Sequence, residues 1–319
     1  MSELARRTLG DSGIEVPIVG IGCNNFGGRT DEESSRRTIL AALDLGMGFF
    51  DTADIYSRGR SEEITGRALG RRRDEAVIAT KFGGSMGSED RKGGSRRWIT
   101  EAVEDSLRRL GTDHIDLYQH HFFDDRTPLE ETLGTLDELV QAGKVRAIGC
   151  SNYDGAQIEA ASTIATDRGW ARYVTAQNEY SLLKREEVEE SVIPTCRRLG
   201  VSILPYFPLA SGLLTGKYHR GEQPPPGTRL GRDTSRASDL MTDANFDIVE
   251  ALEGFARQHG VEVIDVAIGA LAAQPQVVSV IAGATTPEQA AANARAGRWT
   301  PSASDLAEID RITRPRAAA

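Results

Sequence analysis

The sequence predicts an α/β protein, a (β/α)8 TIM barrel with an N-terminal β-hairpin and a long loop after its seventh strand. Short apolar runs alternate with longer amphipathic stretches, eight times along the chain. The strand candidates are continuously apolar, as in a parallel sheet that is covered by helices. The chain has 319 residues, which suits one barrel domain over residues 1–319 with a large core.

The residues before the first barrel strand form a separate small unit. RRTLGDSGIEVP (6–17) predicts a β-hairpin that turns at Asp-Ser-Gly. We expect this hairpin to close the bottom of the barrel, where the parallel strands begin.

Eight strand–helix units then follow in order. The strands are expected at 19–22, 49–53, 76–81, 115–121, 145–151, 173–179, 201–207 and 277–284. The helices are expected at 31–46, 61–70, 99–111, 128–143, 154–169, 185–200, 245–260 and 287–297. The helical stretches begin with Asp, Ser, Thr or Pro and many end at Gly, which matches the preferences of helix caps.

Two segments interrupt this alternation. Residues 85–95 form a polar loop after the third strand, and residues 219–239 follow the seventh strand and are rich in Pro, Gly and Arg. A structureless loop of the second length inside a compact domain is typically a lid or a ligand clamp.

Charge and composition exclude several classes of function. Lys and Arg number 38 against 47 Asp and Glu, which gives a net charge of −9. Sequence-independent nucleic-acid binding needs a basic surface, so we expect no nucleic-acid partner. No apolar run reaches the length of a membrane span, and the first residues do not resemble a secretory signal.

The cysteines argue against a disulfide framework. Cys23, Cys150 and Cys196 lie far apart and include no CxxC pair. This usage is typical of a reducing compartment, so we expect a cytoplasmic protein.

Polar residues gather where the predicted strands end, and active sites of barrels lie at that rim. Taken alone, each of them has an ordinary structural role as a cap, a turn former or a packed side chain. It is improbable that all of these ordinary roles occur together on one rim. The rim residues are Asp51, Lys81, His120, His121, Ser151, Asn152, Gln177, Tyr206, Gly283 and Ala284, with Tyr56 five residues beyond Asp51.

These residue types suit hydride transfer coupled to proton transfer. A carbonyl that accepts a hydride needs a proton on its oxygen, and Tyr56 offers one. A tyrosine has an ordinary pKa of about 10, and an ammonium such as Lys81, paired with Asp51, would lower it. A neutral His polarises a carbonyl oxygen. Amide and hydroxyl groups suit a flat carboxamide, and the ring of Tyr206 suits stacking.

The motifs FDTADIY, GRSEEITGRALG, IATKFG, DLYQHH, IGCSN, QNEYS, YFPLASGLLTGKY and IAGATTPEQAAAN occur in this order. In these motifs the chain resembles the aldo-keto reductases, in the bacterial branch similar to potassium-channel beta subunits, over residues 8 to 296. The resemblance implies a catalytic set of Asp51, Tyr56, Lys81 and His121. It also implies nicotinamide contacts from Ser151, Asn152, Gln177 and Tyr206.

The rest of the cofactor site is likewise implied by the resemblance. It assigns the pyrophosphate to Leu209, Ser211, Gly212 and Leu213, and the adenosine 2′-phosphate to Lys217 and Arg229. The adenosine-phosphate turn falls on Gly283, Ala284, Thr285, Thr286, Gln289 and Asn293. NADP(H) is therefore the expected cofactor. NAD(H) stays open, because Gly283 and Gln289 stand where mammalian relatives carry Lys and Arg.

The chain departs from the family pattern at His120, which stands where an aliphatic residue is usual. Strand parity with Leu117 and Gln119 predicts that His121 points into the barrel and His120 away from it, whereas a bulge in the strand would exchange the two. A Rossmann fold is unsupported, because GIGCNN after the first strand has Asn25 in place of the third glycine.

The expected function is reduction of an aldehyde, ketone or sugar, or the reverse oxidation of an alcohol. A cofactor-binding regulatory subunit and a metal-dependent barrel hydrolase or aldolase are the alternatives, although the histidines lack HxH or HExxH spacing. The physiological substrate and the oligomeric state stay open. The substrate pocket is expected to be walled by Asn24, Asn25, Phe26, Phe82, Phe122 and Phe123, with Trp98 as a weaker candidate.

Overall fold

Eight parallel strands close into one barrel, with the order of the strands following the chain and β10 pairing with β3 to complete the ring. The computed structural model describes residues 3–314. The barrel strands are β3 (Val19–Gly22), β4 (Phe49–Asp51), β5 (Val77–Phe82), β6 (Ile115–His120), β7 (Val145–Ser151), β8 (Tyr173–Glu179), β9 (Ser202–Tyr206) and β10 (Val280–Gly283). The predicted (β/α)8 barrel is thus confirmed.

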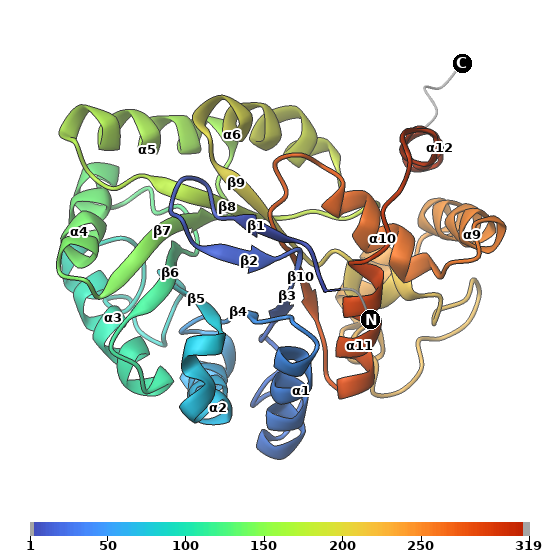
Figure 1. Ribbon diagram of the computed structural model, residues 1–319, viewed down its shortest axis with the longest axis horizontal. Helices are drawn as coiled ribbons and strands as arrows, with labels where there is room; N and C mark the ends of the chain where they lie inside the picture. Colours follow the sequence, from blue (N-terminus) through green and yellow to red (C-terminus); the bar gives the residue numbers. More distant parts are fainter. Residues whose placement is uncertain (1–2, 315–319) are drawn as a thin grey trace.

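Helices surround the strands on the outside (Figure 1). They are α1 (Glu32–Asp44), α2 (Arg60–Leu69), α3 (Arg96–Leu110), α4 (Leu129–Gln141), α5 (Gly155–Arg168), α6 (Ile193–Leu199), α7 (Arg229–Arg232), α8 (Thr234–Leu240), α9 (Asp243–Gln258), α10 (Val263–Ala272), α11 (Pro287–Ala296) and α12 (Ala303–Thr313). Side-chain caps start many of them: Asp31 accepts from the backbone N–H of Ser34, and Asp154 from that of Gln157.

The predicted N-terminal hairpin is present as β1 (Arg6–Thr8) and β2 (Glu15–Pro17), which pair antiparallel. It lies across one end of the barrel in Figure 1. Its side chains Leu9, Ile14 and Val16 are buried and pack with lumen residues such as Phe49 and Leu117. The hairpin therefore fills the amino end of the lumen with apolar side chains, as expected.

Four of the described α-helices were not predicted: α7, α8, α10 and α12. Every residue of α10 is buried, so the segment has no polar face and no amphipathic period to reveal it. The 219–239 segment is not structureless, because α7 lies within it and α8 begins in it. The side chains of Thr228 and Asp233 cap these short helices. Thr and Asp are also common in loops, so the polar composition of the segment did not reveal the caps.

Candidate active site

A cavity of about 540 Å³ opens at the carboxyl ends of the barrel strands. The predicted site residues that line it are Asn24, Asn25, Asp51, Tyr56, His121, Phe122, Ser151, Asn152, Gln177, Tyr206, Leu209, Ser211, Gly212, Lys217, Arg229, Gly283, Thr285, Gln289 and Asn293. They come from segments spread over most of the chain, and the fold brings them to one rim.

The ammonium of Lys81 joins Tyr56 to Asp51. Lys81 Nζ donates to Asp51 Oδ2 at 2.7 Å, to the backbone oxygen of Thr52 at 2.8 Å and to Tyr56 Oη at 3.2 Å. Lys81 is fully buried and Asp51 is almost so. A buried ion pair is tolerated only when further hydrogen bonds satisfy its remaining donors and acceptors, and these contacts do so.

Strand register and a tight turn produce this geometry. Asp51 is the last residue of β4 and pairs with Ala79 of β5, so Lys81 follows two residues later on the same, inward face. Tyr56 lies in the loop after β4. Ser57 and Arg58, directly after it, both have left-handed φ values, of 50° and 55°. This turn directs the chain back over the rim toward α2.

Burial and charge act in opposite directions on these groups. Burial lowers the pKa of Lys81, but Asp51 and Tyr56 outweigh it and raise that pKa to about 12. Burial raises the pKa of Tyr56, and Lys81 lowers it by less, so the net shift is upward. The expectation that Lys81 lowers the tyrosine pKa is therefore right for the contribution of Lys81 and wrong for the net shift. The phenol holds its proton at neutral pH.

His121 stands beside Tyr56 as a neutral ring. The two rings meet edge to face, with their centroids 5.9 Å apart, and Phe122 stacks on His121 at 4.3 Å. Burial and the charge of Lys81 hold the pKa of His121 well below its usual value. The side chain is thus available as an uncharged group next to the phenol.

His120 points the other way, as strand parity predicted. Its ring stacks on Phe82, with centroids 4.9 Å apart, and its Nδ1 lies 2.8 Å from the hydroxyl of Tyr153. Burial lowers its pKa to about 4. His120 belongs to the layer between barrel and helices and does not line the cavity.

The amide and hydroxyl residues of the rim form their own hydrogen-bond network. Asn152, with φ of 59°, donates from Nδ2 to the backbone oxygen of His121 and accepts from the hydroxyl of Tyr206 at 2.6 Å. Gln177 donates from Nε2 to Asp51 Oδ1 at 2.8 Å, and Ser151 donates to the backbone oxygen of Gln177. This network fixes the side chains in place at the rim.

Gln119 is a second amide on Asp51 that was not predicted as a site residue. Its Nε2 donates to Asp51 Oδ1 at 3.2 Å. The signal was present in the sequence, because parity places Gln119 on the same inward strand face as His121.

The segment after β9 makes a tight cradle at the cavity wall. Phe207, Ala210 and Ser211 have left-handed φ values of 51°, 45° and 58°. Gly212 has a φ of 96°, which favours glycine, and Lys217 Nζ lies 2.5 Å from the position that its Cβ would take. Leu213, in contrast, is fully buried in the core and does not line the cavity.

Three cations line the cavity without a carboxylate partner among residues 3–314. They are Arg29, Lys217 and Arg229, none of which forms an ion pair there. Arg29 was missed, since a lone arginine in a loop carries no signal in a single sequence. Its Nε is buried and has no hydrogen-bond partner in the described part of the chain, and its terminal nitrogens donate to Asn25 Oδ1 and to the backbone oxygen of Gly227, each at 3.4 Å. An excess of unpaired positive charge in an acidic protein favours an anionic ligand.

The turn after β10 is held by side chains that cap α11. Thr286 accepts from the backbone N–H of Gln289, and Gln289 Oε1 accepts from the N–H and hydroxyl of Thr285. Gly283, Thr285, Gln289 and Asn293 line the cavity, whereas Ala284 is buried in the core and Thr286 does not line it.

The expected substrate wall needs correction at several positions. Phe26 and Phe82 are fully buried and pack in the layer between the barrel and the helices, as does Trp98. Phe123 packs edge-on against Tyr153, with centroids 5.3 Å apart, and does not line the cavity. A loop aromatic next to a strand end turns to the core as readily as to the rim. Ile55 and Phe207 line the cavity and were not predicted.

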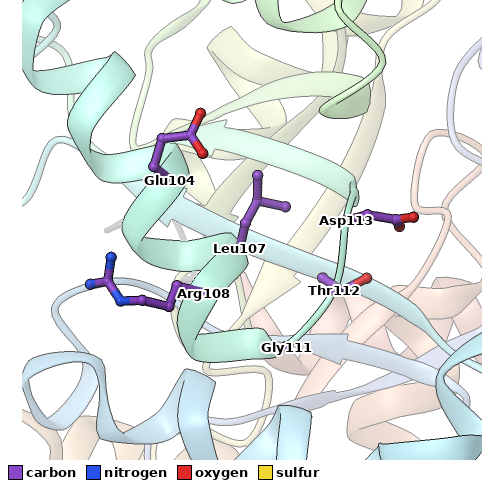
Figure 2. A pocket seen from close by; sticks show the side chains of 6 residues that line it. All are labelled: Glu104, Leu107, Arg108, Gly111, Thr112 and Asp113. Carbon is purple, nitrogen blue, oxygen red and sulfur yellow. The ribbon is translucent and has the colours of Figure 1, made fainter.

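Figure 2 shows a different depression, formed by the end of α3 and the turn that leads to β6. Its lining residues are Glu104, Leu107, Arg108, Gly111, Thr112 and Asp113. This turn precedes a strand, so the depression lies at the amino end of the barrel, away from Tyr56. Arg108 is paired with Asp105, and nothing in this lining resembles a reactive set.

Two features that the alternatives would need are absent from residues 3–314. No group of three His, Cys, Asp or Glu side chains there is placed to hold a metal ion. Among the helices described, none combines the length and the apolarity needed to cross a membrane.

Comparison with known proteins agrees with this geometry. Residues 18–314 match the Aldo/keto reductase family. The chain belongs to this family. It is 36% identical to the aldo-keto reductase YhdN of Bacillus subtilis, over 96% of this chain and 92% of the relative. It is 33% identical to L-glyceraldehyde 3-phosphate reductase of Escherichia coli, over 97% and 92%. It is also 35% identical to a probable voltage-gated potassium channel subunit beta of rice, over 91% and 90%.

Membership identifies the general chemistry. The chain is an oxidoreductase of the aldo/keto reductase family, whose members generally use NAD(P)(H). The resemblance drawn from the sequence motifs is thereby confirmed.

Proposed function

We propose that this aldo/keto reductase reduces an aldehyde or ketone to an alcohol, or catalyses the reverse reaction, with NADP(H) as cofactor and Tyr56 as general acid and base. The observation that supports it most is the hydrogen-bonded series from Asp51 through Lys81 to Tyr56 at the wall of the cavity. The bound cofactor would supply or accept the hydride.

The protein side chains would handle the proton. Lys81 donates to Tyr56 Oη, so the phenol hydrogen is free to donate to a carbonyl oxygen in the cavity. Once that proton has moved, the ammonium lies beside the phenolate and stabilises it. Asp51 keeps the ammonium charged, since it raises the pKa of Lys81. Neutral His121 polarises the same oxygen without adding a second charge.

The lining of the cavity fits a dinucleotide. Tyr206 offers a ring face for nicotinamide, and Ser151, Asn152 and Gln177 offer polar groups for its carboxamide. The cradle at Ser211 and Gly212 suits the pyrophosphate, and the turn from Gly283 to Asn293 suits the adenosine. In barrels, the loops after the seventh and eighth strands often bind phosphate.

The preference for NADP(H) over NAD(H) is proposed from charge. Lys217 and Arg29 lie close enough that Arg29, after burial, lowers the pKa of Lys217. Two neighbouring cations without a carboxylate suit a phosphate that NAD(H) lacks. Arg229 is the other cation that the resemblance assigns to this phosphate, and it lines the same cavity.

The direct test uses the purified protein with NADPH and a panel of reactive aldehydes. We expect loss of the absorbance of reduced nicotinamide with several of them, and slower loss with NADH at equal concentration. Folded protein that oxidises NADPH with none of these aldehydes would refute the proposed reaction.

A regulatory subunit is the second candidate, because the rice relative is named as a probable channel subunit. A mass measurement in cell extract separates the two: a stoichiometric complex with another protein would favour this role, and the free chain or a homo-oligomer would not.

We further propose that the whole chain acts as one domain and that it works in the cytoplasm. Cys23, Cys150 and Cys196 are free and buried, which suits a reducing compartment.

A further inference from the structure

Gln119 is a fully buried amide in the barrel lumen. It lies on β6 and pairs with Lys81 of β5, and the pair of lumen residues directly below, Leu117 and Ala79, is apolar. Gln119 does not line the cavity. Because a buried amide costs free energy unless its hydrogen bonds are made, the partners of Gln119 indicate what it does.

Both carboxylate oxygens of Asp51 accept hydrogen bonds. Oδ2 accepts from Lys81 Nζ at 2.7 Å. Oδ1 accepts from Gln177 Nε2 at 2.8 Å and from Gln119 Nε2 at 3.2 Å. A carboxylate accepts hydrogen bonds and donates none. Each glutamine must therefore turn its NH2 group, and not its oxygen, toward Asp51.

This arrangement leaves the side-chain oxygen of Gln177 available to a ligand. Gln177 Nε2 also donates to Gln119 Oε1 at 3.4 Å, so Asp51 and Gln119 together use both of its N–H groups. Gln177 lines the cavity, and its Oε1 accepts no hydrogen bond from residues 3–314. An acceptor without a partner at a cavity wall suits a ligand that offers an N–H.

The neighbouring rim residues use their donors on one another. Asn152 Nδ2 donates to the backbone oxygen of His121 and to Ser151 Oγ. Ser151 in turn donates to the backbone oxygen of Gln177, and the hydroxyl of Tyr206 donates to Asn152 Oδ1. Gln177 Oε1 therefore stands out on this part of the rim as an acceptor that the protein itself does not satisfy.

We propose that Asp51 and Gln119 fix the amide of Gln177 with its oxygen toward the cavity, so that the site selects a cofactor whose pyridine ring carries an N–H donor. The primary carboxamide of nicotinamide is such a donor. The inference rests on the proposed function, which supplies the nicotinamide cofactor. Gln119 is then a positioning residue, and Asp51 serves cofactor recognition as well as the pairing of Lys81.

The substitution Asp51→Asn should reverse this pattern of donors and acceptors. Lys81 donates, so the oxygen of the new amide must face Lys81. The NH2 group of the new amide then faces Gln119 and Gln177, whose oxygens must turn toward it to accept. Gln177 would consequently present its NH2 group, and not its oxygen, to the cavity.

Calorimetric titration with two oxidised cofactors tests the proposal without turnover. The probes are NADP+ and its acetylpyridine analogue, in which a methyl ketone replaces the carboxamide. The wild type should bind NADP+ about 10-fold more tightly, since the analogue offers no N–H to the oxygen of Gln177. In Asp51→Asn this ratio of Kd values should fall to about one or below, because the ketone oxygen can then accept from Gln177.

Two further variants assign the effect to the lumen amides. Gln119→Met removes one of the two partners of Gln177 Nε2 and should lower the ratio by about 3-fold. Asp51 and Lys81 stay intact in it, so it decides the question even if Asp51→Asn does not fold. Thr175→Val is the matched control and should keep the ratio. Thr175 is fully buried on the same face of β8 as Gln177, and its hydroxyl has no hydrogen-bond partner within residues 3–314.

Several results would overturn the proposal. Equal affinity of the wild type for both cofactors would show that Gln177 does not select an N–H donor. An unchanged ratio in folded Asp51→Asn or in Gln119→Met would show that these residues do not orient Gln177, and an equal fall in Thr175→Val would show a general disturbance of the lumen. Failure to bind either cofactor would refute the proposed cofactor site and this inference together. A wild type that binds NADP+ selectively but oxidises NADPH with no aldehyde would refute the reductase function alone.

Discussion

The two ends of the barrel lumen are filled by opposite kinds of side chain. At the amino end, Leu9, Ile14 and Val16 of the hairpin pack against apolar lumen residues. At the carboxyl end, the lumen holds the buried charges of Asp51 and Lys81 and the buried amide of Gln177, and both Lys81 and Gln177 donate to Asp51.

The two ends of the lumen therefore contribute differently: the amino end to stability and the carboxyl end to chemistry. Apolar contacts at the amino end stabilise the fold at no polar cost. Each charge at the carboxyl end must be paired to be tolerated, and even then a buried pair contributes little net stability. The groups at the carboxyl end are therefore expected to act mainly on a bound ligand. Substitutions at the amino end should change stability, and substitutions at the carboxyl end should change activity.

The largest effect is expected from Tyr56→Phe. Removing the phenol oxygen should lower kcat by about 10²-fold to 10⁴-fold, the usual contribution of a general acid, with little change in the Kd of NADPH. Tyr118→Phe is the matched control, because Tyr118 is buried on β6 and its hydroxyl has no hydrogen-bond partner within residues 3–314. Steady-state kinetics of both variants test this, and a similar loss in the control would remove the special role of Tyr56.

Lys81→Met should destabilise the fold as well as slow the reaction. It leaves Asp51 buried without its ammonium, which costs about 3–5 kcal/mol. Urea unfolding at neutral pH measures this. Lys144→Met is the control, since its pair with Glu104 is exposed and should contribute about 0–1 kcal/mol. Equal losses in the two variants would contradict the buried pair.

Leu9→Ala should affect the amino end alone. Leu9 is fully buried in the lumen, and truncation of such a side chain costs about 2–5 kcal/mol. The unfolding midpoint should fall, while kcat/KM of the folded protein at low temperature should stay within about 2-fold of wild type. A steep fall in kcat at unchanged stability would mean that the two ends are not separable.

Arg29→Gln should give a smaller and selective effect at the carboxyl end. Loss of one charge-assisted contact should weaken NADPH binding by about 10-fold and NADH binding by much less. Cofactor titration followed by fluorescence gives both Kd values. Equal weakening for the two cofactors would place Arg29 on a group that both of them share.

The smallest effect concerns the pH dependence of stability. The buried His120 has its pKa lowered to about 4, whereas the unfolded chain binds that proton near pH 6.5. The folded state thus binds fewer protons, so this contribution to stability is present above pH 6.5 and is lost as the pH falls toward 4. When the pH is lowered from 7 to 4.5, the free energy of unfolding of the His120→Leu variant should therefore fall by less than that of the wild type. If urea unfolding shows that the free energy of unfolding falls equally with pH in the two proteins, this prediction is wrong.

The sequence predicted the repeating units and the rim better than the connecting segments. Strand parity placed His120 and His121 on opposite faces, because a period of two needs no tertiary information. It could not reveal α10, which is buried on all sides, or the orientation of Phe26 and Phe82, which depends on how two neighbouring loops pack. The net upward shift of the Tyr56 pKa also escaped prediction, since burial is a property of the folded protein.

The hairpin that fills the amino end has a kinetic consequence. Among residues 3–314, Leu9, Ile14 and Val16 close that end and the cavity opens at the carboxyl rim, where the proposed cofactor and substrate would both enter. The ring of Tyr206 and the cradle at Gly212 lie along the cavity wall, and a substrate at Tyr56 would rest on a nicotinamide already in place. Under the proposed function, binding in this order would make departure of the cofactor the last event of each turnover, and a slow one if several cations hold its phosphates.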